Sequence, residues 1–176
     1  MFENAGFESG NTNHWSGPTG LLQVQSVDGH GVTPSNGVYY GKSYTDNSGG
    51  DVLVRSDQYW EKPAAGYQYL AFDYRVLLQG VTGTFNYQIV AQTSTAIGTY
   101  SNSQIGNGDT GWRTVAFYVG DISTSTGIKI NFLGDYTGVF VPYSDHVHYY
   151  YDYGRWTSND ATFISGYTTV IISPVS

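Results

Sequence analysis

The stretch Ile128-Lys129-Ile130-Asn131-Phe132 decides the fold class, because its apolar and polar side chains alternate strictly. Successive side chains of a β-strand point to opposite faces, so the two isoleucines and the phenylalanine would share one face. The lysine and the asparagine would then point to water. This alternation is typical of an antiparallel sheet that has one face on a core and one face in solvent.

The same pattern recurs elsewhere, most clearly where Leu70, Phe72, Tyr74 and Val76 would share a face. No window carries the apolar stripe of an amphipathic helix, and the 23 glycines recur too often for a long helix. Turn signals separate the β-rich runs at the spacing of a sandwich or barrel. The pattern predicts about eight strands, at residues 21–27, 37–44, 51–59, 68–78, 84–93, 112–119, 127–133 and 167–172.

Composition supports a folded β protein and excludes several partners. Charged residues make up 12% of the chain and hydrophobic residues 40%, which is not the composition of a disordered protein. The net charge is −7 and the cations are scattered singly, so we expect neither nucleic acid nor an anionic membrane as a partner. No apolar run approaches the roughly 20 residues that span a bilayer. Residues 1–176 are expected to form a single domain.

Motifs for catalysis are scarce. The chain has no cysteine, no Gly-x-Ser-x-Gly and no His-Glu-x-x-His. Glycoside hydrolysis needs a pair of carboxylates with different pKa values, and no such pair can be recognised from the spacing of the acidic residues. We therefore expect a protein that is not an enzyme.

An aromatic-rich segment runs from residue 134 to 166 and contains Tyr149-Tyr150-Tyr151. A structureless loop of this length is uncommon in a compact domain, so a hairpin or loop insertion is expected. Tyrosine supplies contact area at modest entropic cost, which makes the segment the main candidate for a contact surface. A His-x-His pair could also reach one metal ion, but no third ligand is identified. The candidate ligand-binding residues are Tyr149, Tyr151, His146, His148, Asp152, Arg155, Trp156 and Trp60.

The N-terminal sequence Asn4-Ala-Gly6-Phe7-Glu8-Ser-Gly10, followed by Trp15, resembles the signature of jelly-roll carbohydrate-binding modules appended to bacterial polysaccharide-degrading enzymes. The resemblance continues from Gly31 to Tyr40. It implies an antiparallel jelly-roll sandwich, a fold also found in phage tail and capsid-surface proteins. In those modules this glutamate helps to hold a structural calcium with an aspartate of the last strand. The resemblance thus implies calcium at Glu8, although residues 167–172 lack that aspartate.

Two functions follow as hypotheses. The first is a non-catalytic carbohydrate-binding or adhesion domain that contacts a polysaccharide or cell-surface glycan through aromatic rings. The second is a phage virion structural protein, such as a decoration, fibre or tail component, that uses the same fold for contacts between subunits in a homo-oligomer. The start of the chain, Met1 followed by Phe-Glu-Asn-Ala-Gly, lacks a secretory signal. Three explanations are open: a module of a longer exported chain, a mature form, or a virion protein released by lysis. Each is consistent with the expected extracellular or virion-surface location.

Overall fold

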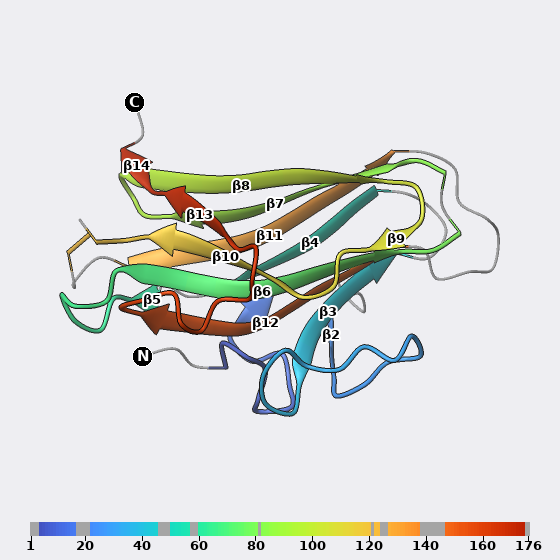
Figure 1. Cartoon of the computed structure of the whole chain (residues 1–176), viewed down its shortest axis with the longest axis horizontal. Helices are drawn as coiled ribbons and strands as arrows, with labels where there is room; N and C mark the ends of the chain where they lie inside the picture. Colours follow the sequence, from blue (N-terminus) through green and yellow to red (C-terminus); the bar gives the residue numbers. More distant parts are fainter. Residues whose placement is uncertain are drawn as a thin grey trace.

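The chain folds as an all-β sandwich of jelly-roll type (Figure 1). The computed structural model describes residues 4–16, 22–45, 50–56, 60–80, 82–120, 122–123, 127–137 and 147–174. The first sheet, here called the β11 sheet, has the order β1 (Trp15–Ser16), β4 (Gly50–Ser56), β11 (Gly127–Thr137), β7 (Thr84–Gln92), β8 (Ala96–Ile105) and β14 (Ser173–Pro174), with β5 (Trp60–Glu61) also paired to β11.

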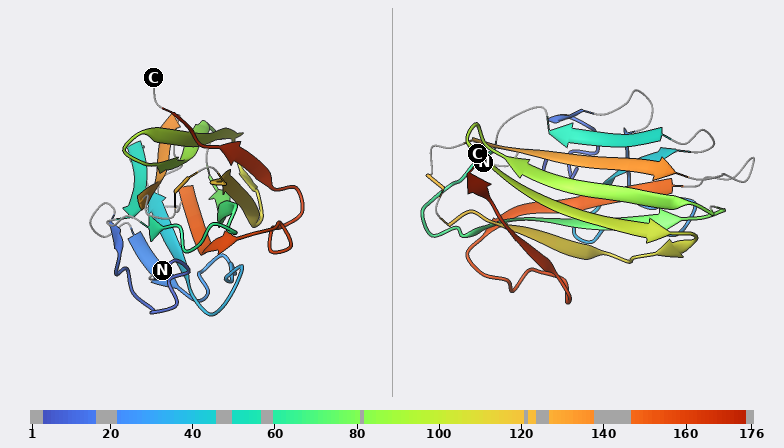
Figure 2. Two further views of the ribbon diagram at one scale, coloured as in Figure 1. Left: turned by 90° about the vertical axis from the view of Figure 1, so that its left-hand side faces the viewer. Right: turned by 90° about the horizontal axis from the view of Figure 1, so that it is seen from above.

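The second sheet, here called the β12 sheet, has the order β13 (Thr168–Ile171), β10 (Arg113–Tyr118), β6 (Tyr69–Leu78), β12 (Val147–Thr157), β3 (Tyr40–Thr45) and β2 (Leu22–Gln25), with β9 (Gly108–Asp109) also paired to β6. Among the strands described, β10 and β13 form a parallel pair and the other pairs are antiparallel. The two sheets lie face to face, and consecutive strands often change sheet (Figure 1, Figure 2). Within the residues described, no helix is long and apolar enough to span a membrane.

An aromatic core fills the space between the sheets. Phe72 of β6 and Phe132 of β11 meet edge to face at 5.6 Å between ring centroids. Trp15 stacks on Phe7 at 4.9 Å and meets Trp60 edge-on at 5.2 Å. Such offset and edge contacts add to the free energy that burying the rings supplies. The tryptophan of the N-terminal motif is therefore a core residue.

The sequence predicted the fold class correctly, and each of the eight expected strands overlaps a strand of the structure. The tyrosine-rich segment differs from the prediction. Its first residues continue β11, and residues 147–157 form β12, which lies between β6 and β3 in the opposite sheet. Residues 147–157 are thus a central strand of the sandwich, whose alternate tyrosines supply core volume, and residues 138–146 lie outside the described residues. β8 was also not predicted, since Ser, Asn and Gln interrupt its apolar pattern.

Candidate functional site

Register places a row of polar side chains on the outer face of the β12 sheet. Gln23 pairs with Lys42, Lys42 pairs with Tyr150, and Tyr150 pairs with Arg75. Directly paired residues of antiparallel strands point to the same side of a sheet. Tyr149 and Tyr151 point to the opposite side, into the core. The row beginning at Gln23 therefore faces away from the core.

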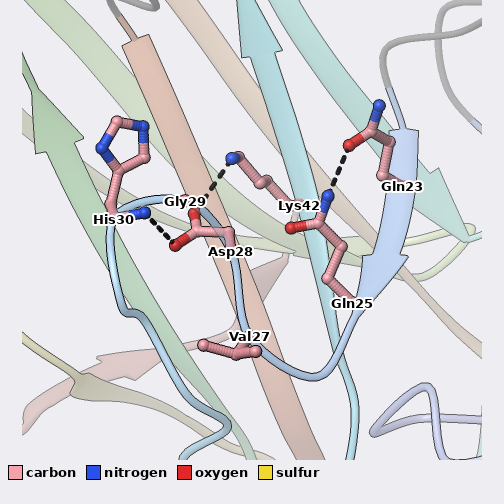
Figure 3. Close-up of a pocket in the computed structure, with 7 residues that line it drawn as sticks. All are labelled: Gln23, Gln25, Val27, Asp28, Gly29, His30 and Lys42. Atoms are coloured by element: carbon pink, nitrogen blue, oxygen red, sulfur yellow. Dashed lines mark hydrogen bonds and ion pairs between the residues drawn. The ribbon is translucent and has the colours of Figure 1, made fainter.

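A pocket of about 460 Å³ opens over the edge of this face (Figure 3). Strands β2 and β3 form its floor, and the turn after β2 forms its wall. Figure 3 shows the Lys42 side chain reaching across to Asp28, with His30 beyond it and the two glutamine side chains beside it. The lining residues are Gln23, Gln25, Val27, Asp28, Gly29, His30 and Lys42.

Asp28, in the wall of the pocket, accepts hydrogen bonds from four different residues. One of its carboxylate oxygens accepts N–H bonds from His30 at 2.9 Å and Val32 at 3.1 Å. The other accepts a hydrogen bond from the Tyr150 hydroxyl at 2.5 Å and forms an ion pair with Lys42 Nζ, which lies 3.0 Å away. Burial opposes ionisation of Asp28, but these donors outweigh burial and hold its pKa at about 2. Asp28 is thus a fixed anion and not a general acid at neutral pH.

The Lys42–Asp28 pair leaves the pocket with little net charge. Their side chains are only 7% and 2% exposed, so each charge is compensated by its partner and not by water. The Gln25 amide donates to the Gln23 side-chain oxygen at 2.8 Å. Two side-chain amides supply both donors and acceptors. The pocket therefore suits a neutral ligand rich in hydroxyl groups.

Aromatic rings close the inner side of the pocket. The His30 ring lies 4.4 Å from the fully buried ring of His148, measured between centroids. Tyr150 meets Tyr40 at 5.5 Å and Trp112 at 6.3 Å, both edge to face. The Trp112 indole N–H donates to the Thr33 carbonyl at 2.8 Å and so fastens the segment that follows the pocket turn. These contacts fix the shape of the pocket from behind.

The structure corrects most of the predicted contact surface. Trp60, Tyr149 and Tyr151 are at most 1% exposed and belong to the core, so their rings cannot stack on a glycan. His148 is also fully buried, although it lies directly behind the pocket. The alternation of the segment was predicted, but the candidates came from both faces of the strand: Tyr149 and Tyr151 pack into the core, and His148 on the other face is buried as well.

The remaining candidates that the structure describes lie along β12. Asp152 and Arg155 are buried and bind other parts of the chain, and Trp156 is half-buried against the core. His146 lies outside the described residues, so its assignment stays a prediction. Within the described part of the chain, no group of three or more His, Asp or Glu side chains is arranged to hold a metal ion.

Glu8 is an acceptor for backbone amides. Both of its carboxylate oxygens accept from Val38 N–H, at 3.0 and 2.9 Å, and one also accepts from Tyr39 N–H at 3.1 Å. Amide hydrogens at these oxygens repel a cation, and calcium needs six to eight oxygen ligands. The donor set around Glu8 does not fit the calcium that the N-terminal motif implies.

Calcium should therefore leave the stability of the fold unchanged. We expect the same thermal midpoint in millimolar calcium and in excess chelator, because the amides of Val38 and Tyr39 already satisfy Glu8. Differential scanning calorimetry measures this directly. A midpoint that rises with calcium in the wild type, but not in Glu8→Gln, would restore the calcium site.

Sequence reasoning missed the pocket residues. Gln23 and Gln25 are alternate polar residues of an expected strand, and Asp28-Gly29 was recognised only as a turn. The available signal was the glutamine at every second position beside a turn that carries Asp, His and Gly. The pairing of Asp28 with Tyr150 joins residues 122 positions apart and could not be read from local sequence.

Comparison with known proteins identifies the fold. No family model matches the sequence, and no curated protein matches it. Among solved structures, TmCBM61 in complex with β-1,4-galactotriose is similar at a TM-score of 0.51 and 16% identity, covering 86% of this chain and 92% of that one. A CBM28 carbohydrate-binding module specific for non-crystalline cellulose gives 0.54 and 14%, covering 90% and 96%. An exo-β-agarase gives 0.53 and 14%, with 90% of this chain matching 26% of that one.

Proposed function

We propose that this protein is a non-catalytic glycan-binding domain and that the pocket over β2 and β3 binds a neutral sugar. The observation that carries the proposal is the charge-compensated, amide-lined pocket on the outer face of the β12 sheet. Sugar hydroxyls require donors and acceptors at close spacing, and side-chain amides supply both. The shared fold with carbohydrate-binding modules supports this assignment.

The pocket chemistry favours binding over hydrolysis. Hydrolysis of a glycosidic bond uses two carboxyl groups, one of which must donate a proton. Asp28 supplies the single carboxylate of the pocket lining, and four donors hold it ionised. A domain of this kind would act outside a cell or on a particle surface, where polysaccharides are available.

Binding to a glycan panel should locate the site. We expect the wild type to bind at least one neutral polymer among soluble galactan, non-crystalline cellulose and agarose, with an affinity on the order of micromolar to millimolar. The double variant Gln23→Ala/Gln25→Ala should lose at least about tenfold in affinity, since each lost polar contact to a ligand is worth about 1 kcal/mol. Isothermal titration calorimetry with matched thermal unfolding separates lost binding from lost folding.

Gln88→Ala provides the matched control. Gln88 is an exposed glutamine on β7, in the other sheet, and should retain full affinity. Loss of binding in this variant alone would move the site to the β11 sheet. Stronger binding to polygalacturonate than to the neutral polymers would contradict a neutral ligand.

The virion-subunit function stays an alternative prediction. It requires a stable oligomer or a lattice partner, whereas an isolated glycan-binding domain should be monomeric. Sedimentation equilibrium distinguishes the two. An oligomer that binds no glycan of the panel would replace the present proposal with the virion assignment.

A further inference from the structure

Four aromatic rings form a row where β6 begins and β10 ends. Tyr118 meets Tyr69 at 5.8 Å, Tyr69 meets Phe163 at 5.6 Å, and Phe163 meets Tyr167 at 4.8 Å, all edge to face. Tyr167 is 38% exposed and the other three rings are partly exposed. We call this set the aromatic row. Exposed rings gathered in one place mark contact surfaces more often than scattered ones do.

Arg155 holds the aromatic row in place from below. Its guanidinium lies 5.5 Å from the centroid of the Phe163 ring, and its nitrogens donate to the side chain and the carbonyl of Thr162 at 3.1 and 2.8 Å. The same group pairs with the buried carboxylate of Asp73 at 3.0 Å. The loop that carries Phe163 is thereby ordered before any ligand arrives, which lowers the entropic cost of binding.

Polar groups border the exposed end of the row. The Tyr167 hydroxyl donates to the Asp160 carboxylate at 2.6 Å, and Asn159 accepts a bond from Ala161 N–H at 3.0 Å. Asp160 and Asn159 are both exposed. A fixed ring face beside a carboxylate and an amide can stack on the apolar side of a pyranose while hydrogen-bonding its hydroxyls.

The aromatic row and the pocket lie on the same face of the same sheet. Lys42 pairs with Tyr150, which pairs with Arg75 of β6. Tyr69 lies six residues before Arg75 on the same strand, and residues at even spacing share a face. Tyr69 also pairs with Tyr118. Tyr69 is roughly 20 Å from Arg75 along β6, and Lys42 lies two strands to the side of Arg75, about 10 Å away. The pocket and the row are thus roughly 20–25 Å apart, a distance that one extended polysaccharide chain can cross.

We propose that the aromatic row is a second glycan-binding site, which stacks against the sugar rings of the same neutral polysaccharide whose chain enters the pocket. This inference rests on the proposed function. Asp73 compensates the charge of Arg155, so the row offers no net attraction to an anionic chain. The net charge of −7 opposes close approach of a second copy of the protein. A polysaccharide that contacts both places gains avidity that a short oligosaccharide in one place cannot.

The test compares galactan, non-crystalline cellulose and agarose with their own trisaccharides, because only the polymers span both places. Tyr167→Ala should lower affinity for the bound polymer by at least tenfold and leave trisaccharide binding at the pocket unchanged. Tyr167→Phe keeps the ring but loses the hydrogen bond to Asp160, so its affinity should fall less than that of Tyr167→Ala. Ile105→Ala removes a side chain that is 77% exposed on the β11 sheet, and it should have no effect.

The outcomes separate the two sites. Wild-type polymer affinity in both Tyr167→Ala and Phe163→Ala, each folded by calorimetry, would overturn the second site and leave the pocket standing. Loss of polymer binding in Tyr167→Ala, with full binding in Gln23→Ala/Gln25→Ala, would support the aromatic row and overturn the pocket. A wild type that binds none of the polymers overturns both.

Discussion

Replacing Arg155 by methionine should lower the free energy of unfolding by about 3–5 kcal/mol, the usual cost of removing one partner of a buried ion pair. Arg155 and Asp73 have side chains only 7% and 2% exposed, and their closest charged atoms are 3.0 Å apart. Asp73 would keep its bond from the Thr114 hydroxyl at 2.7 Å but would lose its counter-charge. Chemical denaturation by urea measures the change.

Arg75→Met is the matched control for this experiment. Arg75 forms a bidentate pair with Asp109, at 2.9 and 2.6 Å, but the two side chains are 22% and 35% exposed. Water compensates these charges when one is removed, so we expect a loss below about 1 kcal/mol. Adding Asp73→Asn to Arg155→Met should restore part of the lost free energy of unfolding, because it removes the carboxylate that has no counter-charge. Equal losses in the two arginine variants would contradict the role assigned to the buried pair.

Arg155→Lys should be only slightly more stable than Arg155→Met, because an ammonium group cannot form the paired hydrogen bonds of a guanidinium. Besides Asp73, the guanidinium donates to the Tyr153 carbonyl at 2.7 Å and to the hydroxyl and the carbonyl of Thr162. These bonds join β12 to the loop that carries Phe163. The stability of the sandwich and the order of the aromatic row therefore depend on the same side chain.

Alternation alone predicted the fold class, but it could not rank the two faces of each strand. In β12, Tyr149 and Tyr151 fill the core, while His148 and Tyr150 point outward and are nevertheless fully buried. Segments before and after β12 cover this outer face: Val32 packs on it from one side, and Ile164 N–H binds Thr114 on the other. Coverage by distant segments leaves no periodic trace in a sequence.

The candidate site was missed for a related reason. Apart from Lys42 of β3, its polar residues come from the edge strand β2 and the turn after it, where a polar side chain is ordinary and gives no distinctive signal. What distinguishes Asp28 is its set of partners, among them Lys42 and Tyr150, which only the pairing of β3 with β12 brings near. Phe7 and Trp15 of the N-terminal motif are core residues, and core residues specify folds rather than ligands.

Asp152 should make the protein less stable at pH 8 than at pH 5. Burial raises the pKa of this carboxyl to about 7. Hydrogen bonds from the backbone N–H groups of Asn36 and Tyr153, and from Ser35, act in the opposite direction but are outweighed. Unfolded, the group has its ordinary pKa of 3.8. Between these two values the folded state holds the extra proton, so the free energy of unfolding falls as the pH rises. Between pH 5 and pH 8 the free energy of unfolding should fall by at most about 3 kcal/mol.

Urea denaturation at both pH values, for the wild type and for Asp152→Asn, isolates this effect. The variant cannot ionise at this position and should lose most of the difference. Asp28→Asn is the control: Asp28 has a pKa of about 2 when folded and 3.8 when unfolded, so it is ionised in both states throughout this range. Its substitution should change the stability at both pH values equally. A pH difference that persists in Asp152→Asn would assign it to another group.

The same carboxyl links pH to the pocket. One Asp152 oxygen accepts from Ser35 N–H at 2.9 Å, the Ser35 hydroxyl at 3.1 Å and Asn36 N–H at 3.1 Å. These residues continue the segment that starts at Asp28 and passes beneath Trp112. When the carboxylate is protonated and loses its negative charge, the hydrogen bonds that it accepts from these N–H groups become weaker. Below pH 7 the fold as a whole should thus gain stability while this segment is held less firmly, and amide hydrogen exchange at Ser35 and Asn36 should become faster relative to the core strands.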